Sequence, residues 1–160
     1  QSIETNIAFQ EFDRENINPI RLESAVEDAA LSQEIKGFPE GLQTRVGERG
    51  VTLSGGQRQR TSLARLFYRP FQVLLLDDVM SAVDHATEAA LIESVYRRGV
   101  DCTKLIVSHR TSVLAHADRV LVMSDGRIVG EGHHADLITR PGPYRDAYKL
   151  QTKELGREGT

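Results

Sequence analysis

The residues with the clearest capacity for chemistry form one run, the sequence LSGGQRQR at residues 53–60. Ser54 and Gln57 have the S-x-x-Q spacing of a capping box, which predicts that a helix begins here. Gly55 and Gly56 fall at its first positions, where backbone N–H groups and the positive end of the helix dipole can hold an anion. The run predicts an anion cradle. The alternative is a capped helix that only follows a Gly-Gly turn.

A pair of acidic residues follows an aliphatic run further along the chain. Residues 73–76 read Val-Leu-Leu-Leu, and Asp77 and Asp78 come directly after them. A short aliphatic run predicts a strand that is buried on both faces, as in a parallel sheet. Ligands bind at the carboxyl ends of such strands, and a carboxylate there is a natural Mg²⁺ ligand. The alternative is an aspartate that caps a helix or a turn.

The elements that must position these residues divide the chain into a helical first part and an alternating second part. An apolar stripe from Leu22 to Ala30 predicts a helix that ends near Gly37, and a second helix covers 55–68, before Pro70. Alternating strands and helices then predict a parallel sheet. The expected segments are strand 73–76, helix 86–98, strand 105–107, helix 111–116, strands 119–123 and 127–130 joined by an Asp125-Gly126 hairpin, and helices 134–139 and 143–151.

Composition limits the remaining function classes. The 160 residues carry a net charge of −3 without a basic block, so we expect no nucleic-acid partner. No run approaches the ~18 apolar residues that a membrane span needs. Cys102 is the only cysteine, which excludes an internal disulfide, and the five histidines show no metal-ligand spacing.

The order and spacing of four motifs resemble those of the ATPase domains of ABC transporters. The four are LSGGQRQR, VLLLDD, the SAVD at 81–84 and the IVSHR at 106–110, which are similar to the signature motif, Walker B strand, D-loop and switch-histidine region. TRVGERG at 44–50 is similar to the loop that exporters present to their membrane domains, and 117–132 also resembles the exporter subgroup. The resemblance covers nearly the whole chain.

The resemblance implies an α/β fold and a division of roles. Residues 1–69 would form the helical subdomain, 70–151 the C-terminal part of a P-loop NTPase (RecA-like) parallel-sheet core, and 152–160 a charged, frayed tail. ATP would lie between two ATPase domains at the cytoplasmic face of a membrane. The resemblance implies that the signature residues Ser54, Gly55, Gly56 and Gln57 bind the ATP held by the second domain. Asp77 would bind Mg²⁺, and Asp78 would be the catalytic carboxylate. Asp84 would reach across the interface of the two domains, and His109 would contact the γ-phosphate.

Two departures from the family pattern shape our expectations. No G-x-x-x-x-G-K-[ST] loop occurs in the sequence, so we expect these residues alone to be a C-terminal piece without ATPase activity. Asp78 stands where the family usually has glutamate, which predicts a slow site and favours a heterodimer whose partner keeps the glutamate. The 44–50 loop would contact the transmembrane domains. The alternatives are a soluble ABC-type ATPase of DNA repair or translation, and a regulatory nucleotide-binding module that does not hydrolyse ATP.

Overall fold

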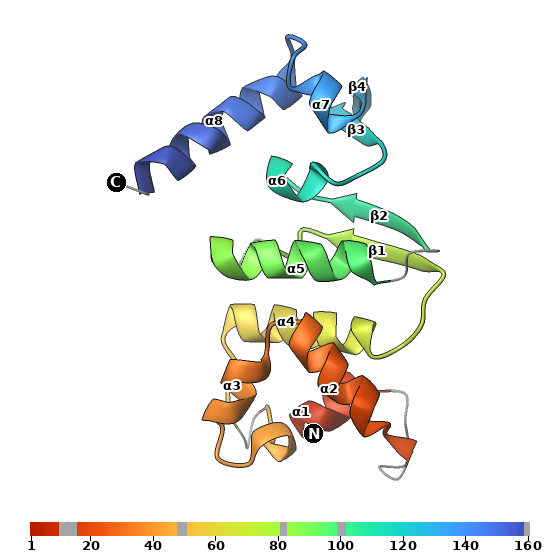
Figure 1. Cartoon of the computed structure of the whole chain (residues 1–160), viewed down its shortest axis with the longest axis vertical. Coiled ribbons are helices and arrows are strands. Elements are labelled where there is room, and N and C mark those ends of the chain that lie inside the picture. Colours follow the sequence, from red (N-terminus) through yellow and green to blue (C-terminus); the bar gives the residue numbers. More distant parts are fainter. Residues whose placement is uncertain (10–15, 48–50, 81–82, 99–101, 159–160) are drawn as a thin grey trace. The chain divides into compact units, whose positions relative to one another are not determined.

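The computed structural model describes residues 1–9, 16–47, 51–80, 83–98 and 102–158 (Figure 1). The chain forms two compact units. The first contains Gln1–Leu75 and Val79–Leu105, and the second contains Leu76–Asp78 and Ile106–Thr160. The predicted boundary between residues 69 and 70 falls inside the first unit and stays a prediction about the complete ATPase domain.

The first unit is mainly helical, and it includes residues 1–69, for which the sequence predicts mainly helices. Its helices are α1 (Ile3–Ile7), α2 (Pro19–Asp28), α3 (Ser32–Gly37), the 3₁₀ turn η2 (Gly41–Gln43), α4 (Gly55–Phe67) and α5 (His85–Arg97). Both α1 and α2 pack against α4. Leu63 and Phe67 on α4 are buried, as are Leu91 and Val95 on α5, because residues three or four apart share one face of a helix. The sequence predicts a helix over 55–68, and the observed α4 ends one residue earlier, at Phe67.

The expected helix through Gly37 is wrong, because the chain turns at Ala30. The N–H of Leu31 donates to the carbonyl of Val26, and the N–H of Ala30 donates to that of Glu27. These two bonds make a Schellman motif, with Ala30 at φ 52° in the left-handed position that glycine usually occupies. Leu31 is 2% exposed. Burial of this side chain offsets a left-handed alanine's cost of about 1–2 kcal/mol.

A two-stranded sheet joins β1 (Val73–Asp77) to β2 (Thr103–Val107). The strands run parallel, since Thr103 donates to the carbonyl of Gln72 before β1 and Asp78 donates to that of Val107 at the end of β2. Alternate residues of β1 are buried, while Val73 and Leu75 are 60% and 69% exposed. The prediction of burial on both faces is thus wrong for the described residues, because they cover only one face of the strand.

The second unit contains α6 (Thr111–Leu114), β3 (Val120–Ser124), β4 (Arg127–Gly132), α7 (His134–Leu137) and α8 (Pro143–Glu158). The predicted hairpin is confirmed: β3 pairs antiparallel with β4, and Asp125 and Gly126 have φ of 48° and 72°. Two positive φ values are those of a type I′ turn.

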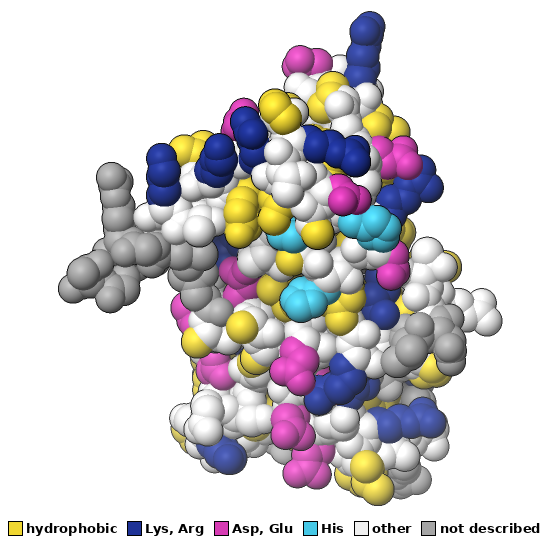
Figure 2. Space-filling view, turned by 45° about the horizontal axis from the view of Figure 1, so that its top comes forward, with side chains coloured by type: hydrophobic (Ala, Val, Ile, Leu, Met, Phe, Trp, Pro, Cys, Tyr) yellow, Lys and Arg dark blue, Asp and Glu magenta, His cyan; other side chains and the backbone are white. Residues whose placement is uncertain are grey.

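The C-terminal helix is longer than predicted. We expected a helix over 143–151 and a frayed tail over 152–160, but α8 continues to Glu158. Residues 152–158 contain no proline and mostly good helix formers, so the helix propagates through them. None of the described helices is long and apolar enough to cross a membrane. Figure 2 shows both acidic and basic side chains on one face of the molecule, as the mixed charge pattern of the sequence predicts.

Candidate functional site

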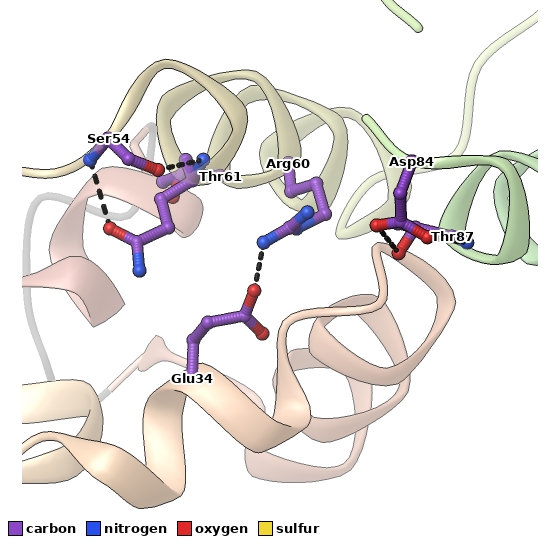
Figure 3. Close-up of polar contacts among 7 residues, drawn as sticks. Glu34, Ser54, Arg60, Thr61, Asp84 and Thr87 are labelled. Carbon is purple, nitrogen blue, oxygen red and sulfur yellow. Dashed lines mark hydrogen bonds and ion pairs between the residues drawn. The ribbon is translucent and has the colours of Figure 1, made fainter. Parts of the chain in front are cut away.

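The predicted capping box at the start of α4 is present. The backbone N–H of Gln57 donates to Ser54 Oγ at 3.2 Å, and the backbone N–H of Ser54 donates to Gln57 Oε1 at 2.9 Å (Figure 3). Ser54 and Gly55 are exposed at this end of a 13-residue helix. The amides of Gly55 and Gly56 lie in the first turn, where the helix itself supplies no carbonyl partner.

The charge at this helix end is not compensated by the helix itself. The first turn of α4 contains no acidic residue, and its cap is the neutral Ser54. Helix α5 differs, because its cap is Asp84 and its first turn contains Glu88. The hydrogen bonds that Asp84 accepts from the amide and the hydroxyl of Thr87 hold its pKa below the ordinary value. The positive end of α5 therefore has its own carboxylates, whereas that of α4 is available to an external anion.

The space beside Gly55 is also open within the described residues. A Cβ placed on Gly55 would meet no atom within 4 Å, and the residue is not in the left-handed region. Neither packing nor backbone conformation within the described chain therefore requires glycine here. A requirement for glycine at this position would have to come from a molecule that approaches the helix end closely.

Contacts along α4 fix the direction in which this end points. Arg60 is 9% exposed and pairs with Glu34 of α3 (Figure 3). Arg58 donates to the carbonyl of Leu53 at 2.6 Å, and the hydroxyl of Thr61 donates to that of Gln57 at 2.7 Å. The start of α4 is thus held both by its own first turns and by a neighbouring helix.

The carboxyl edge of the β1–β2 sheet collects three predicted residues. Asp77 is the last residue of β1 and is exposed, and the half-buried Asp78 follows it. The N–H of Asp78 donates to the carbonyl of Val107 at 2.9 Å, so the loop at Asp78 and the loop that contains His109 leave the sheet side by side. His109 is exposed. Asp78 has a φ of 47°, a left-handed conformation that aspartate tolerates better than most residues.

Asp77 has the chemistry to take part in binding a magnesium–nucleotide complex. Among the described residues, no group of three or more histidine, cysteine or acidic side chains could hold a metal ion. Magnesium is commonly bound through one or two carboxylates together with phosphate oxygens and water, and the exposed Asp77 fits that arrangement. Ser54, Gly55, Gly56 and Asp84 belong to the first unit, and the carboxyl-edge residues to the second.

Sequence reasoning missed one residue of the carboxyl edge. Gln151, on α8, donates from Nε2 to the carbonyl of His109 at 2.8 Å. Its Oε1 accepts from both the amide and the hydroxyl of Thr111, each at 2.9 Å. No sequence signal indicates this contact, because 42 residues separate Gln151 from His109. Ser81 and Ala82 of the D-loop and residues 48–50 of the predicted exporter loop lie outside the described residues.

Comparison with known proteins identifies the family. A family model described as "ABC transporter" matches residues 2–81. The chain belongs to the ABC transporter family. It is 38% identical over 150 residues to an ATP-dependent lipid A-core flippase of Cupriavidus metallidurans, covering 94% of this chain and 25% of that protein. It is 41% identical over 138 residues to the probable multidrug resistance ABC transporter ATP-binding/permease protein YheI of Bacillus subtilis, covering 86% of this chain and 24% of that protein.

A solved structure agrees with these relatives. The structure of a bacterial Atm1-family ABC exporter with ATP bound matches with a TM-score of 0.83 and 34% identity, covering 94% of this chain and 26% of that one. The α/β fold predicted from the sequence is thereby confirmed as that of an ABC exporter nucleotide-binding domain. This ABC chain spans about a quarter of the length of the relatives it matches.

Proposed function

We propose that this chain is part of the ATP-hydrolysing region of an ABC exporter, which acts at the cytoplasmic face of a membrane and closes on ATP as a dimer. The observation that carries the proposal is the exposed start of α4, whose first turn has no acidic residue. A second argument is the family membership. Membrane association of the full-length protein separates this proposal from a soluble ATPase of DNA repair or translation.

A dimer is proposed because one helix end is too small a site for a nucleotide. Ser54, Gly55 and Gly56 offer only a hydroxyl and first-turn amides to a terminal phosphate, so other groups must hold the rest of the nucleotide. The signature residues, with Gln57 fixing the cap, would therefore complete a site whose loop belongs to a second ATPase domain. Asp84 would lie at the interface of the same two domains. The bound nucleotide supplies the phosphoanhydride bond whose cleavage reopens the dimer.

At the carboxyl edge, we assign the roles by position. Asp77 would hold Mg²⁺, Asp78 would orient the attacking water, and His109 would donate a hydrogen bond to the γ-phosphate. Aspartate is one methylene shorter than the usual glutamate, which withdraws the carboxylate by roughly 1 Å, and a misplacement of that order costs about 100-fold in rate. We therefore propose a slow site in this chain and a heterodimer whose partner contributes the faster site.

Single-turnover hydrolysis by the full-length pair tests the slow site. Asp78→Asn should remove the slow phase of phosphate release, and Asp78→Glu should accelerate it by about tenfold or more, because the longer side chain regains its reach. Glutamate at the left-handed φ of 47° costs about 1 kcal/mol of backbone strain. This strain is smaller than the lowering of the activation free energy that we expect from the longer side chain. If Asp78→Glu leaves the rate unchanged while Asp78→Asn abolishes it, the slow-site proposal is wrong.

The transmembrane partner is proposed to dock beside the 44–50 loop. A hollow of about 480 Å³ lies within the first unit, and its lining includes Val46, Gly47, Leu53 and Arg58. The hollow thus borders both the loop and the residues that precede α4. Charge reversal at Glu48 should lower transport more than it lowers nucleotide binding, because the contact would carry force rather than hold ATP.

An ATPase assay on these 160 residues alone should give background turnover.

A further inference from the structure

One side chain of α8 holds the loop of the proposed switch histidine on both sides. Gln151 donates to the carbonyl of His109 at 2.8 Å and accepts two hydrogen bonds from Thr111 at 2.9 Å. Both polar atoms of its amide are therefore engaged within a stretch of three residues. The bond to His109 uses the backbone, so the exposed imidazole keeps its own donors and acceptors.

Helix α6 cannot fix this loop unaided. It has four residues, and its cap residue, Arg110, makes no side-chain capping bond. The amide of Thr111 opens the helix, and such an amide requires a partner from outside the helix. Gln151 supplies that partner from 40 residues away. Within the loop, the amide of Arg110 also donates to Ser108 Oγ at 3.0 Å.

The position of α8 does not depend on Gln151. Near its start, Tyr144 is 7% exposed, lies in a buried cluster with Val120 and Leu137, and hydrogen-bonds His134 Nδ1 at 2.8 Å. These contacts anchor α8 about two turns before Gln151. A substitution at Gln151 should therefore release the loop at His109 without detaching the helix.

We propose that Gln151 is a positioning residue for His109, and that it acts by fixing the backbone that carries the imidazole. The inference rests on the proposed role of His109 at the γ-phosphate. It adds α8 to the elements that determine hydrolysis. Because the hydrogen bond from Gln151 reaches the backbone carbonyl of His109 and not the nucleotide, its loss should affect turnover and leave nucleotide binding largely unchanged.

The test uses Gln151→Glu in the full-length transporter. The glutamate can still accept from Thr111, but its second oxygen faces the carbonyl of His109 and repels it. The measured quantity is the phase of single-turnover phosphate release that Asp78→Asn removes, which defines this chain's own site. We expect Gln151→Glu to slow that phase about tenfold, while the KM for ATP changes less than about twofold. Gln151→Met, which keeps the length but loses donor and acceptor, should slow it similarly.

A double-mutant cycle separates positioning from general destabilisation. In a His109→Ala background, Gln151→Glu should have no further effect, because the two changes act through one group. Lys153→Ala, at an exposed position of the same helix, is the matched control and should leave the phase unchanged. Equal slowing with and without His109, or no slowing by either Gln151 variant, overturns the inference. If His109→Ala alone leaves the phase unchanged, the proposed function fails instead.

Discussion

Replacing Ser54 by aspartate separates the capping role of this residue from its proposed contact with a phosphate. Aspartate caps helices about as well as serine. It would accept the hydrogen bond that Gln57 N–H now donates to Ser54 Oγ at 3.2 Å, and the reciprocal bond from the backbone of residue 54 would stay. Because α4 has no acidic residue in its first turn, the new carboxylate should add about 0.3–1 kcal/mol of stability.

The effect on ATP-driven closure should have the opposite sign. A carboxylate about 4 Å from one negative charge of a terminal phosphate costs about 4 kcal/mol at an effective dielectric constant of 20. That energy corresponds to about a thousandfold weaker closure. Ser54→Asn is the matched control, since asparagine is an equally good cap without the charge.

The assay is an ATP titration of the full-length transporter, with closure followed by the distance between labels on its two ATPase domains. Ser54→Asp should require far more ATP than Ser54→Asn, while thermal unfolding shows it to be at least as stable. If the two variants close at the same ATP concentration, no terminal phosphate lies at the start of α4, and the reasoning from its uncompensated charge is refuted.

Three further predictions concern neighbouring parts of the first unit. Gly55→Ala should stabilise the fold by about 0.5 kcal/mol, because its Cβ meets no atom within 4 Å, and thermal unfolding measures this gain. The same substitution should weaken ATP-driven closure at least about tenfold, which the ATP titration measures. Asp84→Asn should lower hydrogen-exchange protection in the first turn of α5 near neutral pH. Since the folded pKa of Asp84 is depressed, this difference should shrink as pH falls below about 4 and through that folded pKa, and a constant difference would contradict it. Asp28→Ala should lower the free energy of unfolding by about 2–3 kcal/mol, because the side chain of Asp28 is 10% exposed and its carboxylate pairs with Arg97 and Arg98. Glu27→Ala, at the exposed neighbouring position, is the control and should cost little.

Features with short-range causes were predictable from the sequence. The start of α4 depends on Ser54 and Gln57, three residues apart, and the β3–β4 turn depends on the adjacent Asp125 and Gly126. The turn at Ala30 escaped prediction because alanine occupies a position that normally shows glycine. The exposed face of β1 escaped as well, since an aliphatic run does not reveal whether a second layer covers it.

By itself, the sequence determined the motifs, the helix start that offers its amides, and the acidic pair that ends β1. Each depends on the geometry of a few consecutive residues. Tertiary structure alone decided which distant groups support them. Gln151 reaches the loop of His109 across 42 residues, and Asp28 pairs with Arg98 across 70. Such contacts form only when whole helices pack, because a side chain meets a distant partner through the path of the backbone and not through its neighbours in sequence.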